Sequence, residues 1–156
     1  MLESRAMAAG IEAARAQMAA LVENSHLFKS LDEDAREQAL GAAYICHYRA
    51  GETILQEGEL GDAFYLVVGG TVQVQTARDG KDLVLSQLKQ GAVFGEIAVL
   101  SSQRRTASVV AATEADVAVF EKGLVDRLLV TYPKVRKILE TVMVGRARDT
   151  IEKLNK

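Results

Sequence analysis

The middle of the chain, residues 44–120, consists of short apolar runs separated by glycines, and this pattern constrains the fold most. The separating residues are Gly51, Gly58, Gly61, Gly70, the pair Asp79-Gly80 and Gly91. Runs such as Ile54-Leu55 and Phe64–Val68 have strand length, and Asp79-Gly80 is a preferred two-residue hairpin turn. Many short strands joined by tight turns favour an antiparallel β-roll, that is, a jelly-roll barrel.

Two predicted strands alternate as expected for a sheet with one buried face. In residues 71–75, Val72 and Val74 alternate with glutamines, so the valines should be buried while Gln73 and Gln75 face solvent. Residues 116–120 alternate in the same way. The sheets are therefore predicted to enclose a core on one side.

Helices are predicted on both sides of this β region, so the fold class is α+β. Residues 2–22 carry an amphipathic stripe with alternating four- and three-residue spacing, formed by Met7, Ile11, Ala14, Met18 and Leu21. The stripe either docks on the rest of the domain, which is the commoner outcome, or pairs with another chain as a short coiled coil. Ser30 and Glu33 form a capping box that predicts a helix running to about Leu40.

Residues 122–156 are predicted to be helical again, with a break before Pro133, a residue suited to the first turn of a new helix. One face of the second helix is apolar and carries Val135, Ile138, Leu139, Val142 and Met143. The same face then mixes polar and apolar residues: Arg146, Ala147, Thr150, Ile151 and Leu154. Because a core stripe would not change character in this way, these last turns either contact a ligand or face water.

This organisation divides the chain into an N-terminal helix, residues 1–25, and one domain, residues 26–156. The domain is expected to comprise a helical lead-in (26–43), the β-roll (44–120) and the C-terminal helices (122–156).

Composition excludes several classes of protein. With 156 residues, 49% of them hydrophobic and 26% charged, the chain suits one soluble globular domain. It has no apolar run of bilayer length and no signal-peptide pattern, and its single Cys46 suits a reducing compartment, so we expect a cytoplasmic protein without direct membrane insertion. A net charge of −2 offers no basic surface for nucleic acid, and no helix-turn-helix is expected after the C-terminal helices, so we expect no nucleic-acid partner.

Residues 94–109 contain the groups needed to hold a cyclic sugar phosphate. Gly95 lets the backbone approach a ligand, and the short helix-forming stretch after it offers free N–H groups to an anion. Arg105 presents a planar fork of donors that matches phosphate oxygens. Glu96, at the first turn of that stretch, stays ionised and can accept a hydrogen bond from a ribose hydroxyl. Backbone N–H groups of Ile97, Ala98 and Ala107 would complete the phosphate site.

The same run resembles the phosphate-binding cassette of the cyclic nucleotide-binding domain family, and its Arg-Arg-Thr-Ala segment, residues 104–107, is most similar to the cyclic nucleotide-gated and hyperpolarisation-activated channel branch. The resemblance covers roughly Leu27 to Ile151. It implies that Glu96 binds the ribose, that Arg105 binds the phosphate, and that Thr106 contacts a phosphate oxygen or the guanine amino group. It also implies that the last helix covers the base. The expected ligand-binding residues are Phe94, Gly95, Glu96, Ile97, Ala98, Arg105, Thr106, Ala107, Val74, Leu88, Arg146, Thr150 and Ile151.

The function implied is that of a non-catalytic sensor that binds cAMP, with cGMP as a second ligand, and moves its C-terminal helix in response. No cofactor or metal is expected. The effector partner stays unidentified, and the chain is either an excised channel domain or a standalone receptor, with a homo-oligomer left open. A metal-dependent cupin-like enzyme is disfavoured because His26 and His47 form no His-x-His pair. An interaction or dimerisation module with an empty ligand site is the remaining alternative, which titration with cAMP would distinguish.

Overall fold

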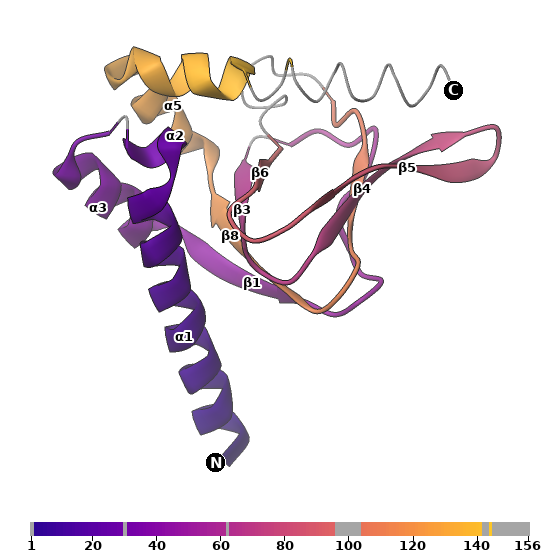
Figure 1. Cartoon of the computed structure of the whole chain (residues 1–156), viewed down its shortest axis with the longest axis horizontal. Helices are drawn as coiled ribbons and strands as arrows, with labels where there is room; N and C mark the ends of the chain where they lie inside the picture. The colour runs from indigo at the N-terminus through magenta and orange to yellow at the C-terminus, as the bar shows by residue number, and fades with distance from the viewer. Residues whose placement is uncertain (1, 30, 62, 96–103, 142–143, 145–156) are drawn as a thin grey trace.

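The computed structural model describes residues 2–29, 31–61, 63–95, 104–141 and 144 (Figure 1). Helices α1 (Leu2–Asn24), α2 (His26–Lys29) and α3 (Glu33–Ala42) precede the strands, and α5 (Lys122–Thr131) and a helical stretch at 133–141 follow them. The strands are β1 (Tyr44–Tyr48), β2 (Thr53–Leu55), β3 (Phe64–Gly69), β4 (Val72–Arg78), β5 (Lys81–Leu88), β6 (Val93–Phe94), β7 (Ser108–Ala111) and β8 (Ala115–Phe120). The predicted α+β arrangement is confirmed.

The strands form two antiparallel sheets, with the orders β1-β8-β3-β6 and β2-β7-β4-β5. Side chains from both sheets meet in one inner cluster, formed by Leu55, Val67, Val72, Phe94, Val109, Ala111, Ala115 and Val117. The apolar faces of the two sheets are thus buried against each other, which confirms the predicted β-roll.

The β4–β5 hairpin closes on the predicted turn. Asp79 and Gly80 have φ values of 54° and 76°, and Arg78 pairs directly with Lys81. Positive φ at both central residues is what a type I′ turn requires.

The alternation predicted for residues 71–75 holds only in part. Val72 is fully buried and Val74 is half-buried, but Gln73 and Gln75 are half-buried instead of exposed. The reason is that β4 lies between β7 and β5, so neighbouring strands flank the glutamines on both sides. The two amides also hydrogen-bond to each other over 3.3 Å.

The helices pack in a second cluster on the other face of the β1-β8-β3-β6 sheet. Its centre is aromatic, with Phe64 stacked on Phe120 at 4.7 Å between ring centroids and Phe28 at 5.4 Å from Phe120. The C-terminal half of α1 contributes the buried Ala14, Met18 and Val22, whereas Ile11 is 51% exposed. The stripe of α1 therefore docks over part of its length, with the unpredicted Val22 as a main contact.

Helix α3 begins differently from the prediction. Its N-cap is Asp32, whose side chain accepts a hydrogen bond from the Ala35 N–H at 2.8 Å, while Ser30 lies outside the described residues. The prediction that Ser30 caps this helix was wrong. Aspartate and serine are equally good N-caps, and the sequence offers both, at positions 30 and 32. At the other end of α3, Arg15 of α1 donates to the carbonyl of Leu40 at 3.2 Å.

The predicted break in the C-terminal helix is confirmed at Tyr132, which ends α5 just before Pro133. Val135 and Leu139 are buried in the helical cluster, and Ile138 is half-buried. The predictions for Val142, Met143 and residues 146–154 lie outside the described residues. Within the described ranges, no helix combines the length and hydropathy needed to cross a membrane.

Candidate functional site

Arg105 lies just before β7 and is the centre of the site. Among the described residues it alone is both charged and buried, with 7% of its surface exposed. Its Nη1 donates to the Gly95 carbonyl at 3.0 Å and its Nη2 to the Ala63 carbonyl at 3.1 Å. Two neutral carbonyls thus replace part of the hydration that the guanidinium loses on burial.

The loop between β2 and β3 fixes the backbone of Arg105. Its N–H donates to the Glu59 carbonyl at 2.8 Å, and its carbonyl accepts from the Gly58 N–H at 2.9 Å. A Cβ at Gly61 would lie 2.6 Å from Arg105 Cζ, so the guanidinium occupies the space that any other residue would fill. The adjacent Arg104 is exposed and donates outward, to the Gly58 carbonyl at 3.0 Å.

Aromatic rings complete the surroundings of the guanidinium. The Arg105 Cζ lies 5.9 Å from the centroid of the Tyr65 ring, and Tyr65 stacks on Phe94 at 5.0 Å with 8° between the planes. Gly95 follows Phe94 with a φ of +85°, and a Cβ there would lie 3.1 Å from the Ala63 carbonyl oxygen and from Arg105 Nη1. Both the left-handed backbone and the close contacts require glycine at this position.

The structure brings some of the predicted ligand-binding residues together. Phe94, Gly95 and Arg105 adjoin one another, and Val74 and Leu88 pack against the inner cluster that contains Phe94. Thr106 is exposed and Ala107 half-buried. The other predicted residues lie outside the described part of the chain: Glu96, Ile97, Ala98, Arg146, Thr150 and Ile151.

Gly61, Ala63 and Tyr65 were missed by the sequence reasoning. They precede Arg105 by about forty positions, and only the folded chain places them beside it. For Tyr65 the alternation of side chains along a strand was a usable signal. Tyr65 lies on the face of β3 opposite to Phe64, Leu66 and Val68. Those three side chains pack in the helical cluster, so Tyr65 points toward the interior of the roll.

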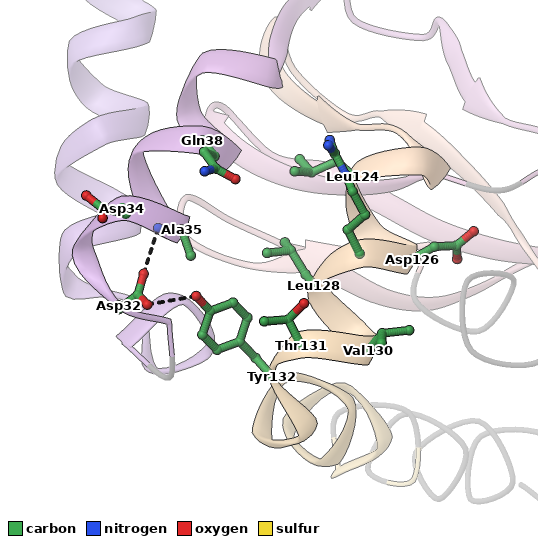
Figure 2. Close-up of a pocket in the computed structure, with 11 residues that line it drawn as sticks. Asp32, Asp34, Ala35, Gln38, Leu124, Asp126, Leu128, Val130, Thr131 and Tyr132 are labelled. Carbon is green, nitrogen blue, oxygen red and sulfur yellow. Dashed lines mark hydrogen bonds between the residues drawn. The ribbon is translucent and has the colours of Figure 1, made fainter.

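A cavity of about 580 Å³ lies apart from this site, between α3 and α5 (Figure 2). At its edge the Tyr132 hydroxyl donates to Asp32 Oδ2 at 2.8 Å. This bond raises the pKa of Tyr132, and the hydrogen bonds from Ala35 and Tyr132 lower the pKa of Asp32. The contact joins the two helices through the N-cap residue.

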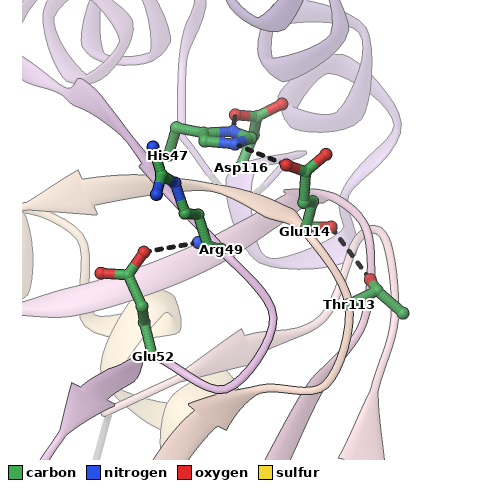
Figure 3. Close-up of polar contacts among 6 residues, drawn as sticks. All are labelled: His47, Arg49, Glu52, Thr113, Glu114 and Asp116. Carbon is green, nitrogen blue, oxygen red and sulfur yellow. Dashed lines mark hydrogen bonds and ion pairs between the residues drawn. The ribbon is translucent and has the colours of Figure 1, made fainter.

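A polar cluster lies where paired strands β1 and β8 adjoin the bend that precedes β8 (Figure 3). His47 Nδ1 is 2.8 Å from Asp116 Oδ1, and its Nε2 is 3.9 Å from Glu114 Oε1. The hydrogen bond with Asp116 raises the pKa of His47. Across the described part of the chain, no three His, Cys, Asp or Glu side chains gather closely enough to hold a metal ion.

Comparison with known proteins assigns the β-roll to one class of domain. The family model described as "Cyclic nucleotide-binding domain" matches residues 45–132. Cyclic nucleotide-gated channel beta-3 of Canis lupus familiaris is 35% identical over 76% of this chain and 16% of its own. The cAMP-dependent protein kinase regulatory subunit of Blastocladiella emersonii is 32% identical over 76% of this chain and 30% of its own. The chain therefore spans less than a third of the length of either relative.

A solved structure supports the same assignment. The regulatory domain of Toxoplasma gondii PKA, crystallised with cAMP, has a TM-score of 0.69 and 26% identity over 72% of this chain and 43% of its own. The sensor domain of the transcriptional regulator DNR from Pseudomonas aeruginosa, at 19% identity and a TM-score of 0.73, covers 88% of this chain and 93% of its own and shares the fold.

Proposed function

The chain belongs to the cyclic nucleotide-binding domain family, and from that premise we propose that it binds a cyclic nucleotide through Arg105 as a non-catalytic regulatory domain. The observation that supports this most is the buried guanidinium of Arg105. A buried cation held by neutral carbonyls is incompletely compensated, and an anionic phosphate would supply the missing charge.

The ligand is proposed to be cAMP, with cGMP bound within about tenfold, which corresponds to about 1.4 kcal/mol. The proposed contacts run from Phe94 to Ala98 and from Arg105 to Ala107, with Val74 and Leu88 nearby. Glu96 is proposed to accept from the 2′ hydroxyl. Relatives that include a cAMP-dependent kinase subunit and a structure containing cAMP support this choice of ligand.

The ligand-binding unit is proposed to be residues 26–156. Its C-terminal helix is proposed to move when the nucleotide binds. Val135 and Leu139 anchor its first half in the helical cluster. Arg146, Thr150 and Ile151 would then contact the base, and ligand would shift this segment by the difference in contact energy between its two positions. Amide exchange from 146 to 154 should slow when cAMP is added, and unchanged exchange would contradict the lid. The effector, a domain or protein on which the moving helix would act, is unidentified.

Replacement of Arg105 by alanine tests the site. Each hydrogen bond to a charged group contributes about 1.5–3 kcal/mol, so loss of a bidentate pair should weaken cAMP binding at least about a hundredfold. Arg104→Ala is the matched control, because that side chain is exposed and should leave affinity nearly unchanged. Calorimetry gives both affinities, and circular dichroism checks the fold of each variant. A strong effect of Arg104→Ala with a weak one for Arg105→Ala would refute this assignment.

An interaction module with an empty site is the second candidate. It is favoured by one observation, since the Arg105 guanidinium already donates to two carbonyls. Titration of the wild-type chain with cAMP and cGMP separates the two functions. Heat of binding at micromolar nucleotide supports the sensor, and its absence for both nucleotides supports the interaction module.

A further inference from the structure

We infer that Tyr65 is a positioning residue for Arg105: its ring, stacked on Phe94, forms the surface that holds the guanidinium in place for an anion. The consequence for ligand affinity rests on the proposed function, whereas the positioning itself does not. Tyr65 belongs to neither the predicted ligand contacts nor the cassette, and it acts here through Arg105.

The first argument is the geometry of the ring and the cation. The Arg105 Cζ lies 5.9 Å from the Tyr65 ring centroid, within the range of a cation–π contact. Because Arg105 is 7% exposed, water screens this contact little. The ring is therefore a stabilising partner for the guanidinium in addition to the two carbonyls.

The second argument is that Tyr65 is itself held from the other side. Tyr65 and Phe94 are direct partners in the β3–β6 ladder, and their rings stack at 5.0 Å with 8° between planes. Phe94 immediately precedes Gly95, whose carbonyl accepts from Arg105 Nη1. The stack thus connects the ring beside the cation to the peptide that binds the cation.

The third argument is the tight packing at Gly95. A Cβ at this glycine would lie 3.1 Å from Tyr65 Cδ2 and equally close to Arg105 Nη1, so ring, peptide and guanidinium meet without spare volume. A leucine at position 65 would remove the flat face and the stack while keeping an apolar side chain. The guanidinium and the Gly95 peptide would then both gain freedom to shift, and ordering them again would weaken anion binding.

The test compares Tyr65→Phe, Tyr65→Leu and the control Tyr48→Leu. Tyr48 is a second half-buried tyrosine packed against the same inner cluster, so its substitution reports on general loss of packing. The first readout, without nucleotide, is the NMR signal of the Arg105 Nε–H, which is sharp when the side chain is held in one geometry. We expect it to persist in Tyr65→Phe and Tyr48→Leu and to broaden or vanish in Tyr65→Leu. A sharp, unshifted signal in Tyr65→Leu would overturn the inference, whatever the affinity for cAMP.

The second readout is cAMP affinity in a double-mutant cycle with Arg105→Ala, which removes the cation that the ring is proposed to hold. Tyr65→Leu should weaken binding about tenfold in the wild-type background, and less than about twofold when Arg105 is already alanine. Tyr65→Phe keeps the aromatic ring and should bind cAMP with close to wild-type affinity. Equal losses in both backgrounds would make Tyr65 an ordinary packing residue and overturn the inference while leaving the nucleotide site standing. Absence of binding by the wild-type chain would instead refute the proposed function, and the NMR readout would still decide the role of Tyr65.

Discussion

Replacing Gly61 by alanine should displace the Arg105 guanidinium without altering any charge. The added Cβ would lie 2.6 Å from Arg105 Cζ and closer still to Nε and Nη2. Carbon atoms in favourable contact are about 3.5 Å or more apart, so the guanidinium must move by roughly 1 Å. The backbone of Gly61 needs no positive φ, so the effect of the substitution comes from this contact.

The magnitude follows from the bonds that the movement would break. A shift of that size would lengthen or bend the 3.0 Å and 3.1 Å bonds to Gly95 and Ala63 and so weaken both of them. Hydrogen bonds to charged groups contribute about 1.5–3 kcal/mol each, and burial of Arg105 keeps water from compensating fully. Partial loss of both bonds should lower the free energy of unfolding by about 2–4 kcal/mol.

Urea unfolding followed by circular dichroism measures this change, with Gly41→Ala as the control. Gly41 lies in α3 with nothing within 4 Å of an added Cβ, so alanine there should be neutral or stabilising by up to about 1 kcal/mol. In an Arg105→Ala background the methyl group has room, and Gly61→Ala should then cost less than about 0.5 kcal/mol. An undiminished cost in that background would refute the reasoning, because the methyl group would be meeting something other than Arg105.

Two further predictions concern the ligand and pH. Thr106→Ala should reduce cGMP affinity more than cAMP affinity, because a threonine hydroxyl can accept from the guanine amino group; equal losses in calorimetry would remove Thr106 from the specificity of the site. The hydrogen bond with Asp116 raises the pKa of His47 in the folded protein above its ordinary value of 6.5, so protonated His47 stabilises the fold. This stabilisation is fully present below the pKa of His47 in the unfolded chain, and it is lost as pH rises through the pKa of His47 in the folded protein. Melting temperature should therefore fall between pH 5.5 and 8.5 more steeply for wild type than for His47→Gln, and parallel curves would contradict this.

Local chemistry explains which parts of the fold could be predicted. The Asp79-Gly80 turn and the strands around it follow from residues adjacent in sequence, and the break before Pro133 follows from the geometry of one residue. Asp32 and Ser30 show the limit of this information, because both are good N-caps and the sequence alone does not choose between them. The half-burial of Gln73 and Gln75 depends on which strands flank β4, which no local pattern contains.

The candidate site also combines residues that the sequence could indicate with residues that only the fold brings together. Gly95 and Arg105 were found because they lie in one recognisable run of sequence. The contributions of Gly61, Ala63 and Tyr65 depend on the loop before β3 and on β3 itself meeting the segment before β7, and that meeting is a property of the folded roll. Sequence therefore pointed to Arg105 as the proposed anion-binding residue and missed the residues that hold its side chain.

The two hydrogen bonds from Arg105 to the carbonyls of Gly95 and Ala63 have a consequence for the evolution of this protein. A lineage that no longer used a nucleotide would still lose stability on replacing this arginine, because one buried and one half-buried carbonyl would lose their donor. Purifying selection would thus keep the arginine even after its proposed role in nucleotide binding had ended. By contrast, Thr106 is exposed and no such bond joins it to the part of the chain that the structure describes. Its replacement would therefore mark the loss of the ligand earlier than any change at Arg105.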